Sequence, residues 1–340
     1  MFCDSDDELE IHACANLVAA AEDWDADVVC GTAVRHDVRK GRDQRWRPHL
    51  HARDRVIESL ADETELLYDT ISVNKIFRRE FLTRWKIRFP PGLLFEDQVF
   101  TLQCYLRANK IGVLQASVYR WNVDRVREEG SITQGRMQHR NVTDRIRINE
   151  LMDDLLIDAS DDIRLAKAIK FLRHEGYLYL SAIGENPNLE DAEAAAAAVR
   201  DYLITIDVRA FEHIRPVLRA ACYFLFIGDL DALRRAMRWE RWASVVDTRI
   251  VSNQARQFWA TPEGPIVRGR EATWWLDVTH LHLLDLPFAS RRYFHELQSL
   301  QVRGKRVTAQ IRTTDFADDL GADVQAQLVW SDRNGHVLAS

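Results

Sequence analysis

The sequence predicts an α/β fold in its first part, followed by a helical domain and a small β-rich domain. Apolar residues alternate between helical and strand spacing from residue 1 to about 125, and they follow helical spacing almost throughout from 136 to 253. Beyond residue 261 the spacing is that of strands. We therefore expect three domains, at 1–135, 136–260 and 261–340.

The first domain begins with a helix, predicted from Asp6 to about Ala20 by apolar residues in helical spacing. The stretch "DADVVCGTAV" then predicts a strand, and "NKIFRREFL" predicts a short helix. A turn and a helix follow in "FPPGLLFEDQVFTLQCYLRANK", where Phe95, Val99, Leu102 and Leu106 share one face. The run "IGVLQASVYRW" returns to strand spacing, so this domain is expected to contain a sheet covered by helices.

The later domains are marked by breaks in the pattern. Proline and glycine at 184–187 and 216 predict helix ends in the second domain, and "TPEGP" at 261–265 precedes the change to strands. Asn334-Gly335 is a strong hairpin signal, although the sequence ends five residues later. We expect the third domain to be β-sandwich-like and incomplete.

Composition excludes several classes of protein. The 52 acidic and 46 basic side chains give a net charge of -6, which predicts no general attraction to nucleic acid. Five cysteines without a C-x-x-C pair predict neither a disulfide framework nor a zinc knuckle. The longest apolar run, at 220–228, is too short to span a bilayer, so we expect a soluble, cytoplasmic protein.

One stretch departs from the acidic average. Residues 35–55 gather many Arg, Lys and His side chains around Trp46. Two interpretations stay open at this point: a solvated hairpin, or a surface that binds a phosphorylated or polyanionic partner.

The opening "MFCDSDDEL" contains the first candidate site. Ser5 followed by Glu8 fits a helix capping box, and in that case the aspartates only stabilise a helix start. Alternatively, Asp4 and Asp6 form an Asp-x-Asp motif at the end of a strand and hold Mg²⁺ or Mn²⁺ through carboxylate oxygens, bridging to a diphosphate.

The stretch "LLFEDQVF" contains a second acidic pair at the start of a helix. Glu96 and Asp97 could favour the positive end of the helix dipole. Alternatively, Asp97 is a general base that deprotonates an acceptor hydroxyl, which then attacks an activated carbon. Downstream, "REEGSIT" is either a polar surface loop or a loop whose glycine and guanidinium meet phosphate oxygens.

The order of these motifs carries more information than any one of them. The acidic motif, "ADVVCG", "NKIFRREFL", "IRFPPGLLFEDQVFTLQCYLRANKIGVL" and "REEGSIT" together resemble the second half of the family-two inverting glycosyltransferases with the GT-A fold. The resemblance covers about residues 1–135. The rest is similar to the bacterial branch with helical and β-rich extensions, whose enzymes build or decorate teichoic acids and related cell-surface polymers.

The resemblance implies a partial GT-A domain, a Rossmann-like half, and assigns roles to individual residues. Asp4 and Asp6 match the metal-binding motif for Mg²⁺ or Mn²⁺, and Asp97 matches the catalytic base with Glu96 beside it. Lys75, Arg127 and Ser131 fall where the family lines its donor and acceptor cleft. The implied partners are a nucleotide-sugar donor and a glycopolymer or polyol-phosphate acceptor.

We therefore expect a metal-dependent inverting glycosyltransferase of a cell-surface glycopolymer. The family places several nucleotide-binding strands before the acidic motif; from this we expect that the sequence is a fragment with little activity of its own. The alternative is a non-catalytic polymer-binding or assembly module, in which the acidic motifs only cap helices. Peripheral association with the inner face of the membrane and self-association are left open.

Overall fold

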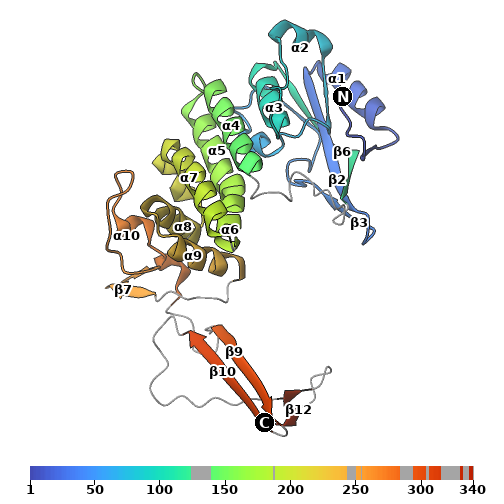
Figure 1. Ribbon diagram of the computed structural model, residues 1–340. Helices are drawn as coiled ribbons and strands as arrows, with labels where there is room; N and C mark the ends of the chain where they lie inside the picture. Colours follow the sequence, from blue (N-terminus) through green and yellow to red (C-terminus); the bar gives the residue numbers. More distant parts are fainter. Residues whose placement is uncertain are drawn as a thin grey trace. The chain divides into compact units, whose positions relative to one another are not determined.

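The computed structural model describes residues 1–123, 139–186, 188–242, 250–253, 255–283, 294–303, 306–314, 330–331 and 337–339. It divides into two compact units, Met1–Ile214 and Arg215–Ser340. Figure 1 shows the sheet and the first helices in the first unit, and the last helices and strands in the second. Each unit is described by itself.

A six-stranded sheet organises the first unit. Its two long strands, β2 (Val28–Asp37) and β6 (Ile111–Val123), pair in parallel. Four short strands pair antiparallel with them: β1 (Glu8–Leu9) and β4 (Arg55–Ile57) with β6, β3 (Arg42–Arg45) and β5 (Lys75–Phe77) with β2. The carboxyl ends of β2 and β6 therefore meet at one edge of the sheet, where ligands commonly bind in α/β proteins.

Helices cover both faces of this sheet (Figure 1). Because side chains alternate along a strand, Val28 and Cys30 of β2 enter one core and Val29 enters the other. Helix α1 (Ala13–Trp24) packs on the second of these cores. The first core contains buried side chains of α2 (Arg79–Trp85) and α3 (Glu96–Arg107), which leaves β2 buried on both faces.

The first core continues into the next helices. Ile148 and Met152 of α4 and Ile163 of α5 belong to the same buried cluster as the side chains of α3. The sheet and the first of the following helices therefore share one core. The predicted division into three domains stays a prediction. The remaining helical elements of this unit are α4 (His139–Leu155), α5 (Asp161–Phe171), η2 (Leu172–Gly176), α6 (Tyr177–Glu185), α7 (Leu189–Thr205), and the 3₁₀ turns η1 (Thr64–Tyr68) and η3 (Val208–His213).

The second unit contains a helix pair and several β-hairpins. Tyr223 and Phe226 of α8 both pack against Trp275, with ring centroids 6.3 and 5.5 Å apart. The strands pair as β7 with β8, β9 with β10 and β11 with β12. The elements are α8 (Pro216–Ile227), α9 (Leu230–Trp242), β7 (Val251–Asn253), β8 (Arg256–Phe258), α10 (Ala272–Trp275), η4 (Thr279–Leu281), β9 (Phe294–Arg303), β10 (Arg306–Thr314), β11 (Trp330–Ser331) and β12 (Val337–Ala339).

Most elements agree with the sequence prediction. The strands at β2 and β6 and the helix after "LLF" are confirmed, and Pro216 stands in the first turn of α8, where its missing N–H costs nothing. The break predicted at 184–187 matches the end of α6 at Glu185. The hairpin turn predicted at Asn334-Gly335 lies outside the described residues.

Two predicted elements are wrong. The first helix begins at Ala13 rather than Asp6, because residues 8–10 pair with β6 instead, with Glu10 N donating to Val118 O. The segment "NKIFRREFL" is a strand, β5, followed by helix α2. In both places, pairing with a distant strand of the sheet overrides the local helical pattern.

Within the described part of the chain, no helix is both long and apolar enough to cross a membrane.

Candidate functional site

The acidic stretch at the start of the chain lies in a turn beside the end of β6. Asp7 N donates to Asp4 O at 3.3 Å, and the Asp7 carboxylate accepts from Tyr119 Oη at 2.6 Å and from Asn122 N at 2.8 Å. The side chains of Asp4 and Asp6 are exposed. Since α1 begins several residues later, the capping interpretation of Ser5 and Glu8 is wrong.

Negative charge accumulates in this turn. Partial burial, and then repulsion from Asp6, raises the pKa of Asp4. Burial also raises the pKa of Asp7, although the hydrogen bonds from Tyr119 and Asn122 oppose the shift. Crowded carboxylates of this kind are stabilised by a cation, and their oxygens are the ligands that Mg²⁺ and Mn²⁺ accept.

The second acidic pair lies at the start of α3, as predicted. Phe95, the residue before Glu96, has φ 67° and ψ 25°, a left-handed conformation that is strained for a bulky residue. Helix α4 holds this loop: the Arg145 guanidinium stacks over the Phe95 ring at 3.3 Å, and Leu94 N donates to Asp144 at 3.1 Å. Such strain persists only where surrounding contacts fix it, and it is typical of functional sites.

The pKa of Asp97 is raised, while its assignment as the catalytic base stays a prediction. Desolvation, and then the neighbouring charge of Glu96, raises its pKa to about 6, even though Arg145 and Lys75 favour its ionised form. A carboxyl group with this pKa is mostly ionised at neutral pH, and it accepts a proton more readily than an ordinary aspartate. The buried Nε of Arg145 has no hydrogen-bond partner in the described structure.

The two acidic segments are linked by aromatic contacts. Phe2, two residues before Asp4, packs against Phe100, one helical turn after Asp97, with ring centroids 5.6 Å apart. Phe2 also contacts Phe77 and Phe89. These contacts tie the start of the chain to α3, while the assignment of Asp4 and Asp6 as metal ligands stays a prediction.

Lys75 lies inside a closed polar network rather than at a surface. Its side chain is 0% exposed, and its ammonium group donates to Ile71 O and Asn74 Oδ1 at 2.7 Å and pairs with Asp69 at 3.2 Å. Although burial opposes it, Lys75 and then His51 hold the pKa of Asp69 at about 2. The assignment of Lys75 to donor binding stays a prediction, and in this structure its three donors already have acceptors.

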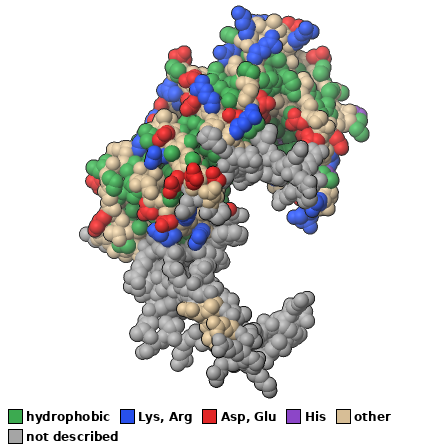
Figure 2. All heavy atoms as spheres, in the orientation of Figure 1, with side chains coloured by type: hydrophobic (Ala, Val, Ile, Leu, Met, Phe, Trp, Pro, Cys, Tyr) green, Lys and Arg blue, Asp and Glu red, His purple; other side chains and the backbone are tan. Residues whose placement is uncertain are grey.

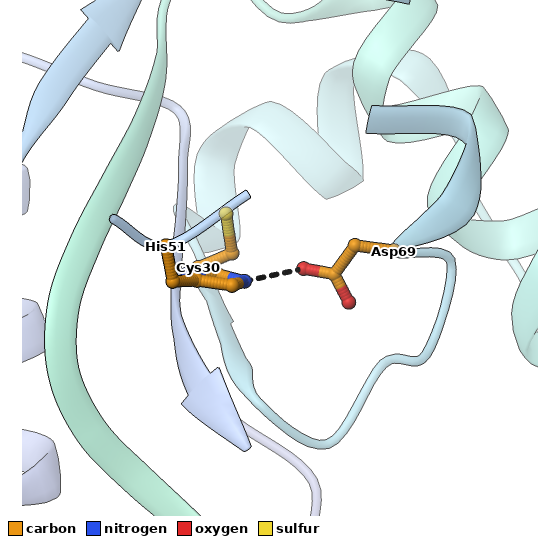
Figure 3. Close-up of side chains that lie close together, drawn as sticks. All are labelled: Cys30, His51 and Asp69. Atoms are coloured by element: carbon orange, nitrogen blue, oxygen red, sulfur yellow. Dashed lines mark hydrogen bonds and ion pairs between the residues drawn. The ribbon is translucent and has the colours of Figure 1, made fainter. Parts of the chain in front are cut away.

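Cys30, His51 and Asp69 form the one group of three ligand-type side chains within 4.8 Å of one another that the described residues contain. Figure 3 shows the His51 ring directed at the Asp69 carboxylate, 3.1 Å away. Both ring nitrogens of His51 face oxygen acceptors, since Nδ1 lies 3.0 Å from Leu114 O. Burial, and then Asp69, raises the pKa of Cys30 to about 12. Lys75 already neutralises Asp69. The group therefore fits a structural ion network better than a cation site.

Two predicted residues, Arg127 and Ser131, lie outside the described residues.

The sequence analysis did not identify Asp7, the stacking of Arg145 on Phe95, or the network around Asp69. Arg145 lies in a helix 48 residues after Asp97, and no local pattern connects the two. Asp7 could have been found, because it belongs to the same acidic cluster as Asp4 and Asp6.

Comparison with known proteins first gives the class of the fold: the chain has the fold of a solved glycosyltransferase structure. That structure is residues 1–349 of Staphylococcus aureus TarS in complex with UDP-GlcNAc, with a TM-score of 0.61 and 22% identity over 80% of this chain and 75% of that chain. The longer TarS structure matches with a TM-score of 0.57 and 18% identity over 93% of this chain and 50% of that one.

Sequence comparison gives the same relative. Poly(ribitol-phosphate) beta-N-acetylglucosaminyltransferase TarS from S. aureus strain MW2 is 26% identical over 235 residues, and the protein from strain Mu50 is 25% identical over the same length. The alignment covers 69% of this chain and 39% of TarS, so the chain spans about two fifths of the length of these relatives. No protein-family model matches the chain.

Proposed function

We propose that this chain is the catalytic part of a glycosyltransferase that transfers a sugar from a nucleotide-sugar donor to a polyol-phosphate polymer. The observation that carries the proposal is Asp97, a carboxylate with a pKa raised to about 6 behind a strained residue, in a chain with the fold of TarS. The name of TarS suggests an N-acetylglucosaminyl group and a poly(ribitol phosphate) acceptor as the first substrates to test.

The proposed reaction is a single displacement that inverts the anomeric carbon. Asp97 takes the proton of an acceptor hydroxyl while that oxygen forms a bond to the anomeric carbon. The bond from this carbon to the diphosphate breaks, and the nucleoside diphosphate leaves with the electron pair. Arg145 and the strained Phe95 position the start of α3, which carries Glu96 and Asp97.

A divalent cation fits the acidic turn. Asp4 and Asp6 are exposed, and partial burial, and then the neighbouring charge of Asp6, raises the pKa of Asp4. We propose that these two residues hold Mg²⁺ or Mn²⁺. When bound, the ion would supply positive charge against the leaving diphosphate.

The proposal is tested by measuring UDP release from UDP-GlcNAc in the presence of Mn²⁺ and a ribitol-phosphate oligomer. The parent chain is compared with Asp97→Asn and with a matched control, Asp62→Asn, which changes an exposed aspartate outside the site. We expect the parent and the control to show acceptor-dependent release, at the low rate that the sequence predicts for this chain, and Asp97→Asn to show none.

Equal rates for all three proteins would refute the role of Asp97. Failure of the parent chain to bind UDP-GlcNAc, or any of the common UDP-, GDP- and CDP-linked sugars, would refute the transferase itself. In that case the alternative of a polymer-binding module would remain, and it predicts acceptor binding without donor binding.

A further inference from the structure

We propose that the hairpin formed by β2 and β3, together with the end of β6, is a docking surface for the phosphodiester backbone of the acceptor polymer. This inference rests on the proposed function and adds to it a polymer-binding surface next to the acidic turn. The hairpin surface consists of Arg35, Arg42, Trp46, Arg47 and Trp121.

Strand register places the central residues of this surface together. Arg35 of β2 lies opposite Trp121 of β6 on one side and opposite Gln44 of β3 on the other. Trp46 follows Gln44 by two residues, and the backbone N–H of Trp46 donates to Ala33 O at 2.8 Å. Because side chains alternate in a sheet, Arg35, Trp46 and Trp121 lie on the same face.

The side chains of this face form a continuous row of rings and guanidinium groups. The Arg35 guanidinium lies 5.5 Å from the centroid of the Trp121 ring, and Trp121 meets Trp46 edge to face at 5.9 Å. Arg47 continues the row, with its guanidinium 5.0 Å from the Trp46 ring and 5.2 Å from the Tyr68 ring. Contacts with the rings limit the positions that the guanidinium groups can take.

This row carries an excess of positive charge, although Asp37 lies opposite Arg42 in the register of β2 and β3. Residues 35–55 contain seven Arg and one Lys against three Asp, in a chain whose net charge is -6. Figure 2 shows Lys and Arg side chains gathered over the tip of the hairpin. Asp43 pairs with His36 and Arg120, and in the described part of the chain no carboxylate lies within ion-pair distance of Arg35, Arg42 or Arg47.

Two hydrogen-bond donors of the surface lack partners. Trp46 Nε1 and Arg47 Nε are buried and have no acceptor among the described residues. Arg47 also has a φ of 46°, a strained backbone conformation for a residue with a side chain. Unsatisfied donors and strain in adjacent residues, beside unpaired guanidinium groups, indicate a place where an anionic ligand binds.

The geometry favours a polyol-phosphate chain, which has phosphodiesters but no bases, over a nucleic acid or a membrane. A nucleobase needs an open ring face for stacking, whereas a guanidinium group already lies over each of the two tryptophan rings. Insertion into a membrane needs exposed apolar side chains, and Val38 is the one large apolar residue exposed on the described hairpin. Flat guanidinium groups, in contrast, match phosphate oxygens.

The hairpin surface begins next to the acidic turn. Trp121 lies two residues after Tyr119 on β6, and the Tyr119 hydroxyl donates to Asp7. A polymer lying along the row would therefore reach the turn that contains Asp4 and Asp6.

The experiment measures binding of a fluorescently labelled ribitol-phosphate octamer to the full 340-residue chain at several salt concentrations. The test variant combines Arg35→Gln, Arg42→Gln and Arg47→Gln. The matched control combines Arg79→Gln, Arg84→Gln and Arg88→Gln, which removes the same charge from exposed positions in and after α2.

We expect the hairpin variant to bind at least about tenfold more weakly than the parent at low salt, and the slope of log K against log salt to fall by about 2. The α2 control should stay within about twofold of the parent. Binding of UDP-GlcNAc, measured by calorimetry on the same proteins, should be unchanged in both variants.

Equal loss in the two triple variants would overturn the hairpin assignment and leave the proposed function intact. So would binding of single-stranded DNA, or of vesicles of an anionic phospholipid, as tightly as the octamer. Loss of UDP-GlcNAc binding in the hairpin variant alone would also overturn it, because the effect would then lie at the donor site. If the parent chain bound the donor but not the octamer, the surface would be refuted while the donor part of the proposed function stood.

Discussion

Asp69 and Asp97 are two carboxylates of the same unit with opposite electrostatic surroundings. Asp69 is 0% exposed and is met by Lys75 at 3.2 Å, by His51 at 3.1 Å and by the Asn74 amide, and its pKa is held at about 2. Asp97 is only partly buried, yet desolvation and Glu96 raise its pKa to about 6. Burial alone therefore does not decide the charge of a carboxylate.

The difference lies in whether the chain itself supplies the partners. The network around Asp69 is complete, so its charges stabilise one arrangement of β2, β5 and the loop before β5. Around Asp97 the nearest charges include a second carboxylate, and the adjacent Arg145 keeps an unused donor. A carboxylate left in this state costs stability, and it is suited to take a proton from a ligand.

The largest effect that would test this comparison is expected at Asp97. Replacement by Asn keeps the shape of the side chain and removes the base, so sugar transfer should fall by about 10² to 10⁴-fold. The melting temperature should not fall, because burial and the neighbouring Glu96 make the negative charge of Asp97 unfavourable in the folded chain. A rate measurement and a thermal scan check this, and an Asp97→Asn protein that melts much earlier would place Asp97 with the structural acids instead.

The opposite pattern is expected at Asp69. Asp69→Ala leaves Lys75 and His51 buried without their carboxylate, which should cost about 3–5 kcal/mol of unfolding free energy. Chemical denaturation followed by circular dichroism measures this, with Asp62→Ala as an exposed control that should change stability by less than about 0.5 kcal/mol. A stability loss below 1 kcal/mol at Asp69 would show that the network is not tightly coupled.

A third test concerns Asp4 and Asp6, because the pKa of Asp4 is raised by burial and a neighbouring carboxylate, as that of Asp97 is. Mn²⁺ titration of the parent should show saturable binding, and the double variant Asp4→Ala/Asp6→Ala should bind at least about tenfold more weakly, a difference of about 1.4 kcal/mol. Both aspartates are exposed, so the fold should be unaffected. Identical titrations for the two proteins would exclude the acidic turn as the metal site.

The sequence predicts the elements whose signal is local. Helix α3 and strand β6 follow directly from their apolar spacing, and the acidic pair at the start of that helix makes Asp97 a candidate base. The network of Asp69, His51 and Lys75 is not predictable in this way, since its members come from separate loops and strands. The same holds for the strand at Lys75–Phe77, because pairing with β2 is a long-range contact that overrides a helical pattern.

The smallest effect separates Asp69 and Asp97 by pH. The folded pKa of Asp97, about 6, lies above the ordinary value of 3.8, so ionisation of Asp97 destabilises the fold, and this penalty develops as the pH rises from about 4 to about 6. For Asp69 the folded pKa of about 2 lies below 3.8, so its contribution to stability is present above pH 4 and is lost as the pH falls toward 2.

The unfolding free energy of Asp97→Asn should therefore gain about 1–2 kcal/mol relative to the parent between pH 4 and pH 7, after allowance for the partial exposure of this residue. Asp69→Asn should show a deficit that is constant from pH 5 to pH 7 and shrinks below pH 4. Denaturation curves at pH 3, 4, 5 and 7 measure both differences, and a difference between Asp97→Asn and the parent that does not change from pH 4 to pH 7 would mean that Asp97 has an ordinary pKa and is not poised as a base.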